Sequence, residues 1–167
     1  MSGERTLVLD HDHVQRKLKR IAIQLCEETW MEKELVLVGV APRGYELAKR
    51  LNDIMSEVSS ARIVLVELTL DKDDPLKTPV RLGTTPEKLT GRTVVLVDDV
   101  LMSGRTLMHA AAHLVQVELT KLITVVLVDR RHRAYPIRAD IVGLTLSTTL
   151  QAHITVEFGR TDAVYLS

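Results

Sequence analysis

Two neighbouring acidic residues lie in a stretch whose residue types could bind a sugar phosphate. In residues 94–106, VVLVDDVLMSGRT, four apolar residues lead into Asp98 and Asp99, and a short polar turn follows at 103–106. Hydroxyls and free backbone N–H groups at the start of a helix attract a phosphate, and Gly104 lets the backbone approach such an anion. The carboxylates would repel a phosphate, so we expect them to accept hydrogen bonds from paired hydroxyls of the same ligand.

Two further loops follow apolar runs. In residues 38–45, VGVAPRGY, Pro42 and Gly44 taken alone fit an ordinary turn between a strand and a helix. The functional alternative is that Arg43 and the backbone N–H groups after it bind a diphosphate. The third loop, 129–140, is basic, and a solvated charge run explains such a segment when it is considered by itself.

The spacing of apolar residues predicts the elements that position these loops. We expect a first helix that is capped at Asp10 and has a core face from Val14 to Leu25. Two more helices are expected at 45–58 and 105–117. Strands are expected at 36–40, 63–70, 94–97 and 122–128, with shorter ones at 141–144 and 154–158. Near-continuous apolar strands separated by helices predict an α/β fold, in which a parallel sheet is covered on both faces. Ligands of such sheets bind beyond the carboxyl ends of the strands.

Length and composition fit a single domain that spans residues 1–167. The polar, proline-containing stretch 71–91 predicts a long loop that is either a functional lid or disordered. The 22 basic and 22 acidic residues cancel, so no overall field attracts nucleic acid or a membrane, although a local basic patch stays open. The single cysteine excludes a disulfide framework and a cysteine metal cluster. Without a long apolar run or a signal peptide, we expect a cytoplasmic protein.

Residues 94–106 resemble the signature with which type I phosphoribosyltransferases bind phosphoribosyl pyrophosphate (PRPP): an apolar strand, two acids, a turn with Thr-Gly-x-Thr, and a helix. The resemblance implies a Rossmann-like parallel sheet and a small hood made by about 129–153 and the N-terminal segment. It implies that Asp98 and Asp99 bind the ribose hydroxyls. The 5′-phosphate would be bound by Val100, Leu101, Met102, Ser103, Gly104, Arg105 and Thr106, with Ser103 in place of the usual threonine.

The same resemblance implies roles for the other loops. The diphosphate would be bound by Ala41, Pro42, Arg43 and Gly44, with a cis peptide between Ala41 and Pro42, and Mg²⁺ would be held mainly by substrate and water. The catalytic residues would be Asp98, Asp99 and Arg43. The long loop would close over PRPP with Lys72, Asp73 and Asp74. The hood would cover the nucleobase with Asp129, Arg130, Arg131, His132, Arg133, Ile137 and Asp140.

Residues 128–143 resemble one branch of this family in particular, which joins uracil phosphoribosyltransferase activity to attenuation of pyrimidine operons. That branch has Val-Asp-Arg-Gly-His-Arg followed by Pro-Ile-Arg-Ala-Asp and a Val-Gly pair. Arg131 stands here in place of the glycine, and Leu144 replaces a lysine. The segment that contains Asp10 and 20–22 fits the same branch.

Met102 bears on the choice of base. In purine-salvage relatives an aspartate at this place exchanges a proton with the purine ring, and a thioether cannot do so. This favours a pyrimidine. The predicted reaction is therefore transfer of ribose 5-phosphate from PRPP to a pyrimidine base, uracil, which gives UMP and pyrophosphate.

The alternative function is regulatory. The resemblance also fits an RNA-binding attenuator that senses uridine nucleotides in the same pocket, with weak or no transferase activity. The mRNA leader would bind a basic face of the first helix, which is otherwise a solvated face: Arg16, Lys17, Lys19 and Arg20. Other expected partners are PRPP with a nucleobase or UMP, and further copies of the chain in a homodimer or higher oligomer.

Other interpretations of residues 94–106 explain less. A Walker B strand needs a G-x-x-x-x-G-K-[ST] loop, and residues 39–44 are followed by Tyr45 instead of lysine. A receiver domain carries its acidic pair on the first strand. A strand that merely ends in acids leaves the Ser-Gly-x-Thr turn unexplained.

A few smaller features favour structural roles. The sequence His11-Asp12-His13 and the pair His109 and His113 suggest a metal by spacing, yet no further ligand group stands near either in the sequence. We expect Cys26 to fill the core. We expect Trp30 to pack or to lie at a subunit contact.

Overall fold

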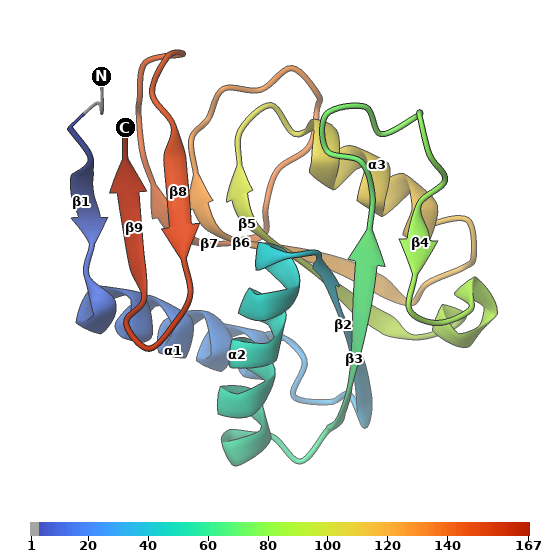
Figure 1. The fold of residues 1–167 in the computed structure, drawn as a ribbon. Coiled ribbons are helices and arrows are strands. Elements are labelled where there is room, and N and C mark those ends of the chain that lie inside the picture. Colours follow the sequence, from blue (N-terminus) through green and yellow to red (C-terminus); the bar gives the residue numbers. More distant parts are fainter. Residues whose placement is uncertain (1–3) are drawn as a thin grey trace.

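The computed structural model describes residues 4–167 and contains two sheets (Figure 1). The larger sheet has six strands in the order β4-β3-β2-β5-β6-β7. Neighbours from β3 to β7 pair in parallel, and β4 pairs antiparallel with β3. The strands are β2 (Glu34–Val40), β3 (Arg62–Thr69), β4 (Arg81–Leu82), β5 (Thr93–Leu101), β6 (Lys121–Asp129) and β7 (Ile141–Thr145). The predicted α/β architecture is confirmed.

Helices cover both faces of this sheet. Helices α1 (His11–Glu28) and α2 (Arg43–Val58) pack on one face, and α3 (Arg105–Leu114) packs on the other. Alternate residues of one strand enter the two cores: Leu35 and Leu37 of β2 contact the α1–α2 side, and Val36 and Val38 the α3 side. Because both faces are buried, the central strands are almost continuously apolar.

The first helix follows the predicted pattern. Its buried positions include Val14, Leu18, Ile21 and Leu25. Asp10 caps the helix, since its carboxylate accepts a hydrogen bond from the backbone N–H of His13 at 2.9 Å. The predicted start of this helix and the predicted buried face are both confirmed.

The smaller sheet has three antiparallel strands in the order β1-β9-β8: β1 (Thr6–Leu9), β9 (Ala163–Leu166) and β8 (Ile154–Glu157). We call it the hood sheet. The predicted hood, 129–153 with the N-terminal segment, did not include residues 154–166, whereas the N-terminal segment joins the hood sheet through β1, which pairs with 163–166 (Figure 1). A strand was predicted at 154–158, where β8 lies, whereas β9 was not predicted.

Three other expectations need correction. Strand β5 does not end at Val97 but continues through both acids to Leu101, because Asp98 and Val100 still pair with Val126 and Val128 of β6. The stretch 71–91 is not one irregular loop: it contains β4 and a 3₁₀ helix at Pro86–Leu89, whose Leu89 is buried. Helix α3 ends three residues earlier than predicted, at Leu114. No helix in residues 4–167 is long and apolar enough to span a membrane.

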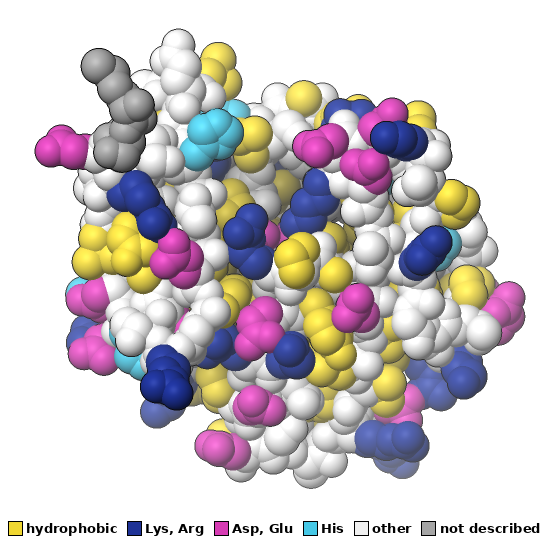
Figure 2. All heavy atoms as spheres, viewed as in Figure 1, with side chains coloured by type: hydrophobic (Ala, Val, Ile, Leu, Met, Phe, Trp, Pro, Cys, Tyr) yellow, Lys and Arg dark blue, Asp and Glu magenta, His cyan; other side chains and the backbone are white. Residues whose placement is uncertain are grey.

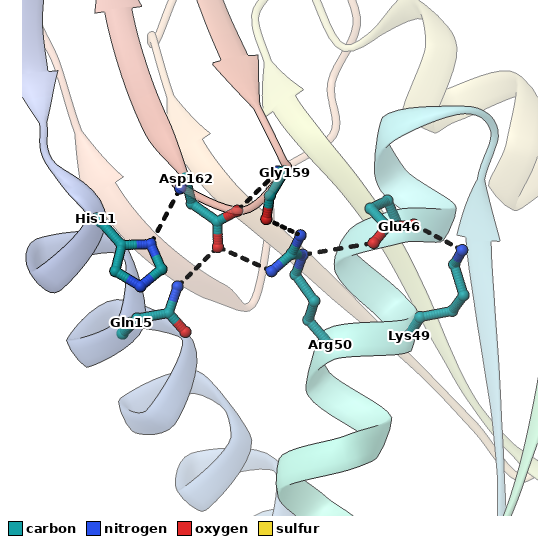
Figure 3. Close-up of polar contacts among 7 residues, drawn as sticks. All are labelled: His11, Gln15, Glu46, Lys49, Arg50, Gly159 and Asp162. Atoms are coloured by element: carbon teal, nitrogen blue, oxygen red, sulfur yellow. Dashed lines mark hydrogen bonds and ion pairs between the residues drawn. The ribbon is translucent and has the colours of Figure 1, made fainter.

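A buried carboxylate fastens the hood sheet to the main domain (Figure 3). Asp162, in the turn between β8 and β9, is fully buried. Its Oδ2 accepts hydrogen bonds from Gln15 of α1 at 2.7 Å and from Nη1 of Arg50 of α2 at 2.9 Å. Its Oδ1 accepts from the backbone N–H of Gly159 at 3.0 Å, and its own N–H donates to Nδ1 of His11 at 3.0 Å. One side chain thus joins two helices to the hood sheet.

These contacts also explain the histidines at the start of α1. The ring of His11 is engaged by Asp162, and Nδ1 of His13 lies 2.7 Å from the carboxylate of Asp10. Within residues 4–167, no group of three or more metal-ligating side chains is assembled. His13 therefore contacts the cap of α1, and His11 contacts the hood sheet.

We predict that Asp162→Ala lowers the free energy of unfolding by about 3 kcal/mol, because it leaves the Arg50 cation without its buried partner. Asp53→Ala, at an exposed position of α2, is the control and should change it by less than about 0.5 kcal/mol. Urea unfolding of both variants measures the difference. Equal effects of the two substitutions would contradict a fastening role for Asp162.

Candidate active site

A pocket of about 390 Å³ lies at the carboxyl ends of β2, β5 and β6. Figure 2 shows the surface hollowed between the hood sheet and the loop after β3, with Lys and Arg side chains along the hollow. The pocket is lined by Arg43, Lys72, Asp73, the segment Asp98 to Leu107, Val126, Arg130, His153 and Ile154. The pocket lies where the sequence predicts the site, beyond the carboxyl ends of the strands.

The turn after β5 leads directly into α3. Gly104 caps that helix with φ +85°, a conformation that favours glycine. A Cβ atom there would lie 2.7 Å from Cγ2 of Ile137, so space as well as φ requires glycine. The hydroxyl of Ser103 accepts a hydrogen bond from the backbone N–H of Arg105 at 3.2 Å. The turn therefore presents the N-terminal backbone groups of α3 to the pocket, which is the arrangement that attracts an anion.

The two acids lie side by side and nearly buried at the centre of the pocket. Asp98 is 3% exposed and Asp99 is 6% exposed. Nζ of Lys72 lies 3.4 Å from Oδ1 of Asp98 and 3.9 Å from Oδ1 of Asp99. Nε of Arg43 lies 3.2 Å from Oδ2 of Asp99. Two cations from separate loops thus converge on one pair of carboxylates.

Burial changes the acidity of this pair. Loss of solvation, with the neighbouring charge of Asp99, raises the pKa of Asp98 to about 8, and the Lys72 cation only partly opposes the rise. The backbone N–H of Asp99 donates to Oδ1 of Asp98 at 2.9 Å. Without a ligand, Asp98 therefore holds a proton at neutral pH.

The loop after β2 is held close to the acids. The peptide bond between Ala41 and Pro42 is cis, as the resemblance implies. A Cβ atom on Gly44 would lie 2.7 Å from the carbonyl oxygen of Val97, so only glycine lets α2 approach β5 this closely. Helix α2 begins at Arg43, two residues earlier than predicted. Its first turn thus faces the pocket with Arg43.

The predicted lid residues separate into two groups. Lys72 and Asp73 line the pocket, and the backbone carbonyl of Asp73 accepts a hydrogen bond from Arg105 at 3.0 Å. Asp74 does not line it, and its backbone N–H donates to Asp71 within a turn. The start of the long loop therefore already contacts the turn after β5.

The basic segment after β6 is mostly engaged in its own structure. Arg133 pairs with Asp129 at 2.7 Å and donates to the carbonyl oxygen of Met102 at 2.8 Å. The ring of His132 lies 2.5 Å from the carbonyl oxygen of Thr148. Asp140 accepts from the backbone N–H of Thr124 at 2.9 Å.

Of the seven hood residues predicted, Arg130 lines the pocket. Arg131 is exposed and adopts φ +59°, so the chain keeps here the left-handed conformation that suits the glycine of the resembling pattern. Asp129, Arg131, His132, Arg133, Ile137 and Asp140 do not line the pocket and support the loop. Their role in covering the nucleobase stays a prediction.

Sequence reasoning missed four lining residues: Leu107 and Val126, which lie within predicted elements, and His153 and Ile154. The last two need a separate explanation. They lie at the start of β8, and they reach the pocket only because the hood sheet folds back over β5. That placement depends on pairing between β8, β9 and β1, which no local pattern predicts.

The four cations of the predicted basic face of α1 do not all lie in one groove. Arg16, Lys19 and Arg20 line an open groove together with Ile23, Gln24, Glu27 and Glu28, and Lys17 lies outside it. Arg20 donates to the carbonyl oxygens of Val142 and Gly143 at 2.7 and 2.9 Å. Trp30, just past the helix, is 77% exposed and does not pack within the chain, whereas Cys26 packs against the core.

The sheet order and the pocket define the type I phosphoribosyltransferase fold, and the family described as "Phosphoribosyl transferase domain" matches residues 5–161. The chain belongs to this family, in the group of bifunctional PyrR proteins. It is 37% identical to the bifunctional protein PyrR of Chloroflexus aurantiacus, over 97% of this chain and 93% of the relative. It is 34% identical to the PyrR of Bacillus pumilus, over 95% and 93%.

Solved structures show the same fold at lower identity. The hypoxanthine phosphoribosyltransferase of Trypanosoma cruzi superposes with a TM-score of 0.77 and 18% identity, covering 95% of both chains. A hypoxanthine-guanine phosphoribosyltransferase of Bacillus anthracis superposes with a TM-score of 0.71 and 21% identity, over 86% of this chain and 83% of that one. At this identity the likeness concerns the fold alone.

We predict that Asp98→Asn changes how stability depends on pH. Folded Asp98 keeps its proton up to about pH 8, whereas an unfolded aspartate loses it near pH 4. The free energy of unfolding of the wild type therefore falls as pH rises through this window. The variant lacks this loss and should be more stable than wild type by roughly 1–3 kcal/mol at pH 8 and nearly equal at pH 4.

Urea unfolding at several pH values measures this difference, and Asp53→Asn at an exposed position is the control. A difference between Asp98→Asn and wild type that stays constant from pH 4 to pH 8 would contradict the raised pKa of Asp98.

Proposed function

We propose that the chain transfers ribose 5-phosphate from PRPP to uracil and releases UMP and pyrophosphate. One observation carries the proposal: a single pocket joins a pair of buried carboxylates, a turn at the start of a helix, and an arginine from a third loop. These three features match the hydroxyls, the 5′-phosphate and the diphosphate of PRPP. The cytoplasmic location stays a prediction from the sequence.

Each part of the ligand has a complementary part of the pocket. Asp98 and Asp99 accept hydrogen bonds from the two ribose hydroxyls, and segment 102–106 binds the 5′-phosphate. Arg43, at the neighbouring strand end, binds the diphosphate. Lys72 and Arg43, now paired with the acids, are the cations that can turn toward the phosphates when the ribose occupies the carboxylates. The protein thus positions the donor and compensates its charge.

The pocket also fits a magnesium ion that enters with PRPP. Two adjacent carboxylates give the pocket an acidic centre, and among residues 4–167 no set of three side chains forms a separate metal site. We propose that substrate oxygens and water hold the ion, with Asp98 and Asp99 beside its water ligands. When bound, Mg²⁺ neutralises charge on the departing diphosphate.

Two observations support uracil as the acceptor. Met102 lines the pocket at the place where purine-salvage enzymes need a proton-exchanging carboxylate, and its thioether cannot serve. The relatives at 34–37% identity bear the name PyrR, whereas the purine enzymes are similar at 18–21% identity and in fold only.

We predict that Asp99→Asn lowers turnover about 100-fold or more, because it removes a charged acceptor for a ribose hydroxyl near the developing positive charge of the sugar. Pyrophosphate release from PRPP and Mg²⁺ is measured with each nucleobase in turn, with Asp53→Asn as the control. Release with uracil alone that is lost in Asp99→Asn supports the proposal. Absence of release with every base, or full turnover in Asp99→Asn, refutes it.

We propose RNA binding as a second function, supported by the bifunctional relatives and by the cations of the α1 groove. Phosphate contacts release counterions, so affinity for the RNA should fall steeply with salt. Arg16→Ala and Lys19→Ala should each reduce the slope of log affinity against log salt by about 0.7–0.9.

Lys17→Ala, on the same helix but outside the groove, is the control and should leave the slope unchanged. The measurement is a titration of the leader RNA of a pyrimidine operon at several salt concentrations. A salt-independent or absent interaction, beside normal UMP synthesis, would leave the transferase as the single function.

A further inference from the structure

Arg130 is a buried cation at the pocket whose partners are all uncharged. Its side chain is 2% exposed, although it lines the pocket. Nε donates to the hydroxyl of Thr148 at 3.0 Å, and Nη2 donates to the carbonyl oxygen of Thr149 at 3.0 Å. Nη1 lies 2.9 Å from the sulfur of Met102. A guanidinium has five N–H donors, so these contacts leave donors free.

The absence of a carboxylate partner distinguishes Arg130 from nearby arginines. Arg43 lies 3.2 Å from Asp99, and Arg133 lies 2.7 Å from Asp129. Within the described residues, no acidic oxygen lies within 4.0 Å of Arg130. An unpaired buried charge is costly, and burial lowers the pKa of Arg130. A site that keeps such a charge is matched to a ligand that brings negative charge.

The sheet order shows which part of the ligand meets Arg130. The strand ends occur in the order β2, β5, β6, and they carry Arg43, the acid pair and Arg130 respectively. On the proposed function, the diphosphate lies at β2 and the ribose at β5. The end of the pocket at β6, which His153 and Ile154 cover from the hood sheet, is then left for the nucleobase.

We propose that Arg130 binds a carbonyl oxygen of the nucleobase and stabilises the anionic form in which the base reacts. This inference rests on the proposed function and assigns the residue that activates the acceptor. A guanidinium beside this carbonyl oxygen lets the base react without a strong general base, because the charge left by the departing proton is spread onto that oxygen.

The step balances as follows. The ring N1–H gives its proton to water, and the resulting charge is shared between N1 and the carbonyl oxygen that faces Arg130. N1 forms a bond to C1′ of PRPP, and the bond from C1′ to the diphosphate oxygen breaks. The diphosphate leaves with the electron pair. Arg130 stays protonated throughout.

Nearby groups do not supply this charge. Asp129 is engaged by Arg133 and by the backbone N–H of Arg131. Asp98 and Asp99 are acids, so neither supplies positive charge to an anionic ring. His153 lines the same end of the pocket and is the alternative, because a neutral imidazole could remove the N1 proton. The experiment therefore includes a His153 variant.

The test compares uracil with 5-fluorouracil, whose N1–H is more acidic. Arg130→Met should lower kcat/KM for uracil about 100-fold, by analogy with loss of one donor to a developing anion. The loss with 5-fluorouracil should be at least about tenfold smaller, since this base already ionises readily. Arg130→Lys keeps the charge and should fall between wild type and Arg130→Met. Thermal melting and PRPP affinity check that the variants fold.

A second readout does not require turnover. The ultraviolet spectrum of bound 5-fluorouracil is titrated with pH in the presence of Mg²⁺ and pyrophosphate. Wild type should bind the anion at a lower pH than free 5-fluorouracil ionises, and Arg130→Met should not. If this shift appears while no base supports turnover, the proposed function fails and the anion site stands.

Three results would overturn the inference. One is an equal loss with both bases in Arg130→Met, which indicates a structural tie to Thr148 and Thr149. Another is a changed ratio of the two bases in His153→Gln but not in Arg130→Met, which assigns the proton transfer to the histidine. The last is binding of 5-fluorouracil with its ionisation unshifted in wild type.

Discussion

The placement of two carboxylates at the buried end of β5 is the constraint on which the site depends. Asp98 and Asp99 continue the strand instead of following it, so hydrogen bonds with β6 fix their backbone. Their mutual repulsion is lowered by a proton on Asp98 and by the cations Lys72 and Arg43. Both cations come from other loops, so the charge of the acids itself draws those loops toward the pocket.

Small residues set how closely these loops can approach. Gly44 brings α2 against β5, and Gly104 brings the turn after β5 against Ile137. In both places a Cβ atom would meet another atom at 2.7 Å. The distances within the pocket therefore follow from backbone packing as much as from the charged side chains. The charged side chains also differ from strand to strand along the edge of the sheet. An arginine paired with an acid follows β2, the two acids end β5, and an arginine without an acidic partner follows β6.

The sequence was informative where local pattern and chemistry coincide. Long apolar strands, the Asp10 cap and the turn at 103–106 have clear signals, and they predicted the main sheet, the helix start and the centre of the pocket. The resemblance added Arg43 and Lys72, which reach the pocket.

The misses have two physical causes. The positions of His153 and Ile154 depend on a sheet of four-residue strands, in which β9 pairs both with β8 and with the distant β1. The neighbours of Arg131 and Asp140 in the basic segment could not be told apart by type, since a loop uses the same residues to bind a ligand and to hold itself together. Arg130 differs from them by its burial and by its uncharged partners, which the sequence does not reveal.

Pairing of β1 with β9 also has a consequence for how the molecule is made. Thr6 pairs with Leu166, so the first described strand cannot pair until 160 more residues have been synthesised. During translation the parallel sheet can form from segments that are already synthesised. The side of the pocket that His153 and Ile154 line has no paired strand until 163–166 are synthesised. A nascent chain can thus have a folded main sheet while its pocket is still incomplete.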